Sequence, residues 1–208
     1  YCNWQRIEQF ETVIRNSAAA EIAAKIMDSQ TAQFFHDHIL IKEPGTSKPT
    51  PWHQDIPFYF VDGRQCVSFW IPLDAVEGAT LRFIAGSHKW PRLVRPTRWL
   101  DDSRFYENND EYIDVPDPEA EPGKYRIIEW QMQPGDAVLF DFRCVHGARA
   151  NMTNNRRRAF SMRWLGDDMV YTMRPGRTSP PFPGHAMGEG QRLREDWFPV
   201  LWSDTDKQ

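Results

Sequence analysis

The chain has 208 residues, of which 40% are apolar and 13% aromatic, and its formal net charge is −4. At about 150 residues per domain, this length predicts one compact domain over residues 1–208, and the composition excludes a disordered chain. Both signs of charge are spread along the sequence, so no basic stripe is available for a phosphate backbone. Nucleic acid is therefore excluded as a partner.

The cysteines and the hydropathy pattern bear on the cellular compartment. Cys2, Cys66 and Cys144 are odd in number and form no Cys-x-x-Cys pair, which predicts neither a disulfide scaffold nor a thiolate zinc site. A cytoplasmic location is the simplest expectation. No run of about 18 apolar residues is present, so we expect no membrane span. Because the first residue is Tyr1 rather than Met, we expect native residues to precede it, and the lack of a signal peptide says little.

The N-terminal part, residues 1–33, has a helical pattern. Ile7, Phe10 and Ile14 recur at helical spacing, and Ser17 can cap a second helical segment. The sequence therefore predicts two short helices before the rest of the domain.

From residue 34 onward the pattern changes to that of short strands. The first is expected over 34–41, with His36 and His38 on one side, and Gly, Pro and Asp turns separate it from the others. Further strands are expected at 52–60, 65–71, 81–84, 125–131, 137–142 and 158–165. Many short strands with few helices between them predict a mostly β fold, a sandwich or jelly roll, over residues 34–165.

Two segments fall outside this pattern. Residues 91–123 show no strand and are rich in Asp and Glu, and a loop of this length inside a compact domain is usually a functional lid or a disordered insertion. We expect a lid. Residues 174–208 begin with a Pro- and Gly-rich stretch and then carry Trp197 and Phe198. They are expected to form an arm that docks on its own domain or on a second subunit, which would make a homodimer.

The first chemical signal is the triplet His53-Gln54-Asp55, at the start of an expected strand. Alternate side chains of a strand face the same way, so His53 and Asp55 can offer an imidazole and a carboxylate to one point while Gln54 faces away. A His-x-Asp triplet also arises by chance as a surface pair or a satisfied hydrogen bond. Alone it does not establish a metal site.

The second signal is His146, followed by Gly147, after the apolar strand expected at 137–142. A non-haem iron oxygenase needs two imidazoles and one carboxylate on one face of the metal, which leaves three positions for a cosubstrate and oxygen. A jelly roll brings sequence-distant strands together, so His146 can complete the set with His53 and Asp55. The alternative is a histidine of the core or of a loop.

The third signal is the basic run Arg156-Arg157-Arg158, which leads into the strand expected at 158–165. A dicarboxylate cosubstrate that chelates iron through its keto-acid end leaves a second carboxylate some ångströms away, and a guanidinium fork is its best partner. Arg157 is the predicted ligand, and a solvated turn is the expectation for the other two arginines.

In combination these motifs resemble the phytanoyl-CoA dioxygenase-like family of iron(II)/2-oxoglutarate-dependent oxygenases. The resemblance extends over about residues 34 to 165. The matching runs are TPWHQD at 50–55, FWIPLD at 69–74, GSHK at 86–89, PGD at 134–136, VHG at 145–147 and RRAFS at 157–161.

The resemblance implies a double-stranded β-helix, the cupin-like jelly roll, that binds Fe(II), 2-oxoglutarate and O2. It places the metal on His53, Asp55 and His146, and the family's spacing from the second histidine also selects Arg157 for 2-oxoglutarate. It further implies that the cosubstrate pocket includes Gln54, Trp70, His38 and Ser161. His88 lies in a turn of the family and is expected to be structural, while no role follows for His36 or His185.

The reaction implied is hydroxylation of a small organic substrate with release of succinate and carbon dioxide. Related halogenases have a small residue at the position of Asp55, so its carboxylate favours hydroxylation. Two alternatives remain open, a cupin-like isomerase or hydrolase that does not use 2-oxoglutarate and a non-catalytic jelly-roll binding module. For the substrate, Arg92, Arg95 and Arg98 favour an acyl-CoA, whereas the acidic stretch after them opposes it and favours a small polar metabolite.

Overall fold

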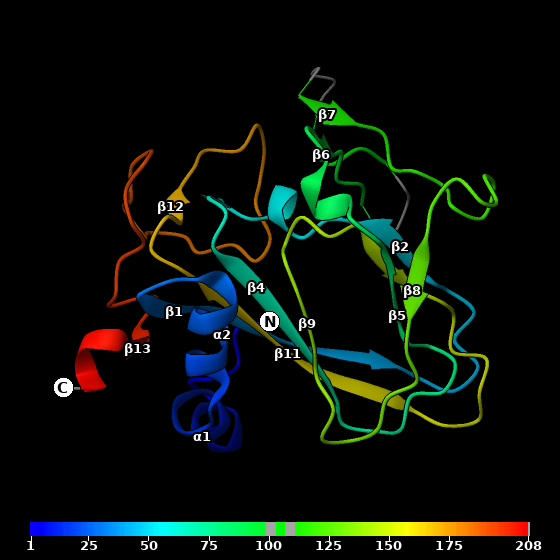
Figure 1. Ribbon diagram of the computed structural model, residues 1–208, viewed down its shortest axis with the longest axis horizontal. Helices are drawn as coiled ribbons and strands as arrows, with labels where there is room; N and C mark the ends of the chain where they lie inside the picture. The colour runs from blue at the N-terminus through cyan, green and yellow to red at the C-terminus, as the bar shows by residue number, and fades with distance from the viewer. Residues whose placement is uncertain (99–102, 107–110, 208) are drawn as a thin grey trace.

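Two antiparallel sheets form the centre of the computed structural model, which describes residues 1–98, 103–106 and 111–207 (Figure 1). The major sheet has the order β13-β1-β11-β4-β9, and the minor sheet has the order β2-β10-β5-β8. The major strands are β1 (Thr31–Lys42), β4 (Cys66–Pro72), β9 (Val138–Phe140), β11 (Arg157–Leu165) and β13 (Val200–Ser203). The minor strands are β2 (Thr50–His53), β5 (Leu81–Ile84), β8 (Ile127–Glu129) and β10 (His146–Ala148). The mostly β, jelly-roll fold is confirmed.

Two short helices, α1 (Glu8–Asn16) and α2 (Ala19–Met27), cover the outer face of the major sheet, as expected (Figure 1). Their apolar side chains join one core cluster with residues of the sheet such as Phe34 and Trp164. The helical part ends sooner than predicted, because β1 begins at Thr31 rather than at residue 34. The extra residues are ordered by pairing with β13, a strand whose pattern is too short to predict.

Strand β11 lies between β1 and β4, and its alternation divides the molecule into an outer and an inner side. Phe160, Met162 and Trp164 belong to the cluster under the helices. Arg157 and Arg163 line a cavity on the other side of the sheet. The inner face of β11 thus carries an arginine at each end.

The strand expected over 52–60 is wrong in one respect that matters for the site. Strand β2 ends at His53, Asp55 has helical dihedral angles (φ −73, ψ −42), and the 3-10 helix η1 (Ile56–Phe58) follows. The backbone N–H groups of Asp55 and Ile56 both donate to Phe142 O, which bends the chain away from the sheet. The second 3-10 helix, η2 (Ser87–Lys89), occupies the expected turn after Gly86.

The acidic segment 91–123 contains two strands that the sequence did not predict, β6 (Leu93–Val94) and β7 (Tyr112–Ile113), which pair in parallel. Two-residue strands carry no readable period, which is why the pattern missed them. Within the segment, Tyr106 Oη donates to Pro57 O at 2.6 Å and so fixes the loop to η1. The prediction of a lid falls partly on 99–102 and 107–110, which lie outside the described residues.

The C-terminal arm docks on its own domain. Just before the arm, strand β12 (Val170–Tyr171) pairs with β3 (Val61–Asp62). Within the arm, β13 pairs with β1, and η3 (Asp204–Lys207) follows. Phe182 and Phe198 pack on Phe35 and Phe60. A homodimer through this arm stays a prediction.

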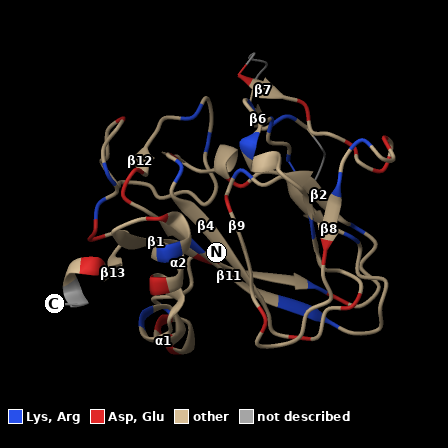
Figure 2. Cartoon of the chain, viewed as in Figure 1, with Lys and Arg blue, Asp and Glu red and all other residues tan. Residues whose placement is uncertain are grey.

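Two further features of the fold concern its charged residues and its helices. In the cartoon of Figure 2, segments with Lys or Arg and segments with Asp or Glu are both scattered over the fold. In the described part of the chain, no helix combines the length and the apolar character needed to cross a bilayer.

Candidate metal centre

Three side chains from two strands and a turn converge on one point. His53 ends β2 and His146 begins β10, and the two are cross-strand partners with ring centroids 4.2 Å apart. Asp55 Oδ1 lies 3.6 Å from His53 Nε2 and 3.8 Å from His146 Nε2. One ligand atom from each residue lies within 4.8 Å of the other two, and all three residues are buried, so they can hold a metal ion. They converge because the chain turns after His53, and not through alternation along one strand.

Backbone carbonyls orient both imidazoles. His53 Nδ1 lies 2.8 Å from Pro51 O, and His146 Nδ1 lies 2.9 Å from Cys144 O. Donation from Nδ1–H to a carbonyl leaves Nε2 deprotonated and free to ligate, which is the usual arrangement behind a metal-bound histidine. Burial, and then the neighbouring His53, lower the pKa of His146 to about 3, so its ring is neutral at physiological pH.

The two oxygens of Asp55 have different partners. Oδ1 faces the imidazoles, whereas Oδ2 accepts hydrogen bonds from Ser68 Oγ at 3.0 Å and from Arg163 Nη2 at 3.3 Å. Burial by itself raises the pKa of Asp55, but Arg163 and the two histidines outweigh it and hold that pKa well below its ordinary value. The centre therefore contains an ionised carboxylate beside the two imidazoles.

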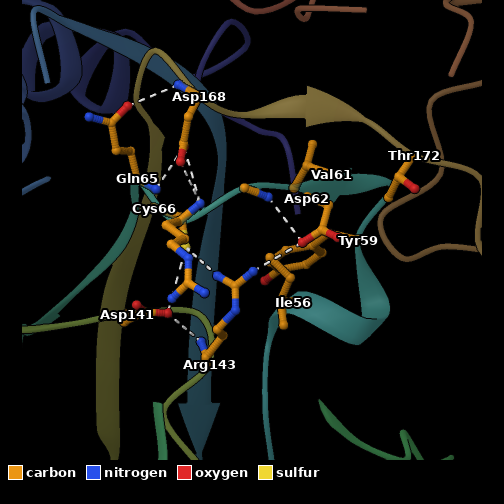
Figure 3. Close-up of polar contacts among 12 residues, drawn as sticks. Ile56, Tyr59, Val61, Asp62, Gln65, Cys66, Asp141, Arg143, Asp168 and Thr172 are labelled. Atoms are coloured by element: carbon orange, nitrogen blue, oxygen red, sulfur yellow. Dashed lines mark hydrogen bonds and ion pairs between the residues drawn. The ribbon is translucent and has the colours of Figure 1, made fainter. Parts of the chain in front are cut away.

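The backbone next to His146 is packed too closely against β2 to accept a side chain at Gly147. A Cβ on Gly147 would lie 2.9 Å from Thr50 O of β2, so only glycine lets β10 approach β2 this closely. The loop before β10 is tied down as well, because Arg143 reaches across to Asp62 at 3.0 Å and its N–H donates to Asp141 at 2.7 Å (Figure 3). These contacts fix the separation of the two histidines.

The metal centre forms one end of a cavity of about 390 Å³. Its walls also include Arg157, whose Nε and Nη1 are buried without a hydrogen-bond partner, and whose guanidinium lies 5.4 Å from the Trp70 ring centroid. Burial lowers the pKa of Arg157 to about 10, which leaves it charged. The remaining walls are formed by Tyr1, His38, Leu40, Thr50, Phe58, Tyr59, Leu81, Thr97, Arg98, Phe105, Phe140, Arg163 and Ser179.

The structure separates the three arginines of the basic run. Arg156 pairs with Glu43 and Arg158 pairs with Asp74, both at exposed positions. Arg157 alone of the three lines the cavity. An unpartnered buried guanidinium costs free energy unless a ligand satisfies it, so Arg157 marks a place for an anionic group.

The other predicted pocket residues are placed differently from one another. Trp70 and His38 line the cavity, and the ring of Tyr1 stacks on that of His38 at 3.8 Å. Gln54 is buried beneath the centre, where it donates to Arg143 O and accepts from Val94 N–H. Ser161 donates to Phe69 O at 2.6 Å and accepts from Arg163 Nη1. Gln54 and Ser161 therefore hold backbone and side chains that surround the cavity.

Sequence reasoning missed Arg163 and Ser68, which donate to Asp55, and Tyr59, which accepts from Arg163. Alternation along β11 from Arg157 would have placed Arg163 on the inner face. Nothing local indicated its partner, which lies on another element of the jelly roll.

The fold and the site define a jelly-roll protein with a two-histidine, one-carboxylate centre in the wall of a cavity. Residues 4–159 match the sequence profile of the family Phytanoyl-CoA dioxygenase (PhyH), so this chain belongs to that family.

Two curated relatives are similar to the chain. Dioxygenase lolE1 of Epichloe uncinata is 25% identical over 165 residues, 74% of this chain and 56% of the relative. A probable phytanoyl-CoA dioxygenase of Caenorhabditis elegans is 28% identical over 143 residues, 64% of this chain and 43% of the relative. The chain thus spans about half the length of these relatives.

Solved structures show the same fold. The non-heme alpha ketoglutarate dependent carbocyclase SnoK, from nogalamycin biosynthesis, has a TM-score of 0.71 and 22% identity over 95% of this chain and 72% of its own. The epimerase SnoN in complex with Fe3+, alpha ketoglutarate and nogalamycin RO has a TM-score of 0.71 and 22% identity over 95% of this chain and 75% of its own. At these identities the likeness establishes the fold alone.

Proposed function

We propose that this chain is an iron(II)- and 2-oxoglutarate-dependent dioxygenase that hydroxylates a small organic substrate and releases succinate and carbon dioxide. The observation that carries the proposal is the presence of two complementary sites in one cavity. The His53, Asp55 and His146 donor set suits a divalent metal, and Arg157 presents an unpartnered buried guanidinium to the same cavity. Family membership supports the same chemistry.

The donor set fits iron(II). Two neutral imidazoles and one carboxylate on one face of the ion leave three positions open, which is the arrangement of non-haem iron oxygenases. When bound, iron and 2-oxoglutarate together would supply the oxidising power that activates dioxygen and removes hydrogen from the substrate. The protein contributes the orientation of the three ligands, through Pro51 O, Cys144 O and the partners of Asp55.

Some side chains of the cavity would contact 2-oxoglutarate directly, and others would hold those side chains in place. Arg157 would bind the distal carboxylate, because its buried guanidinium has nitrogens without a hydrogen-bond partner and a guanidinium is a strong partner for a carboxylate. Trp70 lies beside that guanidinium and His38 lines the same wall. We assign indirect roles to Gln54 and Ser161, which hold the loop before His146 and the Arg163 side chain in place.

The substrate would enter beside an apolar wall. Phe58 packs on Phe105 at 5.4 Å and faces His53 at 6.1 Å, so aromatic rings lead from the cavity wall to the metal centre. A small organic molecule with an apolar face suits this surface. Hydroxylation is the proposed outcome because Asp55 occupies the ligand position that a halide would need.

The proposal is tested by incubating the purified chain with iron(II), 2-oxoglutarate, ascorbate and oxygen, and measuring succinate across a panel of acyl-CoAs, amino acids and aromatic acids. Succinate that depends on one substrate, together with a product heavier by one oxygen, supports hydroxylation. The matched variants are Arg157→Met and Arg158→Met. Loss of succinate in the first alone is expected, and equal succinate release in both would show that Arg157 does not bind 2-oxoglutarate. Wild-type protein that turns over a substrate without releasing succinate would favour a cupin-like enzyme that does not use 2-oxoglutarate.

A further inference from the structure

A second arginine on the inner face of β11 is bonded on every side. Arg163 Nη2 donates to Asp55 Oδ2 at 3.3 Å, Nε donates to Tyr59 Oη at 3.2 Å, and Nη1 donates to Ser161 Oγ. Arg163 and Asp55 are each only 5% exposed. Unlike Arg157, Arg163 has no buried nitrogen without a partner among the described residues. It is therefore committed to the protein and not to a ligand in the cavity.

Ser68 completes the arrangement from the neighbouring strand. Arg163 and Ser68 are cross-strand partners in β11 and β4, and both donate to the same oxygen, Asp55 Oδ2. Ser161, which receives Nη1, is itself fixed by its bond to Phe69 O. The two donors thus stand on two paired strands of the rigid major sheet, while Asp55 stands on a turn.

We propose that Arg163 and Ser68 form an anion clamp that holds Asp55 as a one-oxygen metal ligand, and that Arg163 is a positioning residue of this site. The clamp keeps Oδ2 away from the metal and leaves Oδ1 pointing at the two imidazoles. Without it, the carboxylate is free to rotate about its last bond and to present either oxygen or both. The inference rests on the metal site of the proposed function, but not on 2-oxoglutarate binding.

The clamp has a second consequence. If the carboxylate is removed, a buried guanidinium and a buried hydroxyl are left facing the space that the anion occupied. Charged donors with no partner bind a small anion readily, so Asp55→Gly is expected to accept formate in place of the lost carboxylate. Wild-type protein is expected to bind no formate there, because Asp55 already occupies the clamp.

The test needs no catalysis. The thermal midpoint of metal-free Asp55→Gly is measured with rising formate and, as a control for ionic strength, with rising perchlorate. We expect formate to raise the midpoint of Asp55→Gly more than that of wild type, where it can bind at Arg157 but not at the clamp, and we expect Asp55→Gly/Ser68→Ala to respond less than Asp55→Gly. Equal responses in wild type and Asp55→Gly would overturn the clamp.

Metal affinity gives the second measurement. Cobalt(II) binding is titrated by absorbance in wild type, Arg163→Met, Arg163→Lys and Ser68→Ala. Since loss of a partner behind a metal ligand commonly weakens binding by about 10- to 100-fold, Arg163→Met is expected to fall in that range, and formate should restore part of the affinity of Asp55→Gly. If Arg163→Met does not fold, Arg163→Lys and the formate response decide. Wild-type affinity in the Arg163 variants overturns the positioning role, whereas failure of wild type to bind any divalent metal overturns the proposed function instead.

Discussion

Strand β11 carries two arginines on its inner face, one at its start and one near its end, and the two differ in their hydrogen-bond partners. At one end Arg157 is buried against Trp70 with two nitrogens unpartnered. At the other end Arg163 donates to Asp55, Tyr59 and Ser161. A buried guanidinium that the protein leaves unsatisfied indicates a ligand that arrives later, whereas a satisfied one indicates a part of the scaffold. This difference is the reason why we propose Arg157, and not Arg163, as the ligand of 2-oxoglutarate.

The largest expected effect concerns ligand affinity at the Arg157 end. Arg157→Met should weaken 2-oxoglutarate binding by about 10- to 100-fold, because a charge-assisted pair contributes roughly 1.5–3 kcal/mol and each 1.4 kcal/mol is a factor of ten. Isothermal titration under anaerobic conditions with the metallated protein measures it. Arg158→Met, which removes only an exposed pair with Asp74, is the control and should bind like wild type. Equal losses of 2-oxoglutarate affinity in both variants would show that Arg157 has no special role in binding it.

The second prediction concerns the stability of the two ends. Arg163→Met leaves the Asp55 carboxylate buried without its main partner, so the free energy of unfolding should fall by about 3 kcal/mol. Arg157→Met removes unsatisfied buried groups and should change it by less than about 1 kcal/mol. Urea denaturation in the presence of EDTA measures both. A larger loss of unfolding free energy in Arg157→Met than in Arg163→Met would contradict the assignment of Arg157 to a ligand and of Arg163 to the scaffold.

The third prediction moves from β11 to the strand that carries His146. In Gly147→Ala the new methyl group would collide with Thr50 O, so β10 and β2 must separate and the two histidines with them. Overpacking of this kind costs about 1–3 kcal/mol. We expect a lower denaturation midpoint and weaker cobalt(II) binding, with 2-oxoglutarate affinity reduced only through the loss of metal. An unchanged cobalt(II) titration would show that the site tolerates a change of spacing.

The last prediction concerns the pH dependence of the metal-free protein. Burial, and then Arg163, lower the pKa of His38 to about 3, from an ordinary value of 6.5. Between these two values the unfolded chain binds a proton that the folded chain does not, so stability is complete above pH 6.5 and declines as the pH falls toward 3. His38→Gln should make this decline shallower, as measured by urea denaturation at successive pH values. If stability declines as steeply with pH in His38→Gln as in wild type, His38 is not the group whose protonation destabilises the folded protein.

Much of the site was predictable from the sequence because its chemistry is local. The His53-Gln54-Asp55 triplet, His146 with Gly147, and Arg157 at the start of a strand each carry their residue type and position in a few letters. The prediction that His53 and Asp55 converge by alternation along one strand was wrong, since Asp55 lies in a turn fixed by Phe142 O and not in a strand. That turn depends on a contact between distant segments, which no local pattern encodes.

The fold was predictable to a similar degree and for the same reason. Strands with clear alternation, such as β5 and β11, lie where the pattern placed them, within a residue. Strands β6, β7 and β13 were missed because short strands are defined by their pairing partners rather than by their own period. The role of Arg163 could not be predicted for a similar reason, because its partner Asp55 lies on a distant segment that only the tertiary fold brings to it.

The central claim, that one cavity holds both a metal and 2-oxoglutarate, is tested most directly by anaerobic titration of the iron(II)-loaded protein with 2-oxoglutarate, followed by absorbance. The account predicts a metal-to-ligand charge-transfer band that saturates with 2-oxoglutarate in wild type. It also predicts that Arg157→Met needs far more 2-oxoglutarate to reach the same band, while Arg158→Met matches wild type. Iron-loaded wild-type protein that develops no band and releases no heat with 2-oxoglutarate would contradict it.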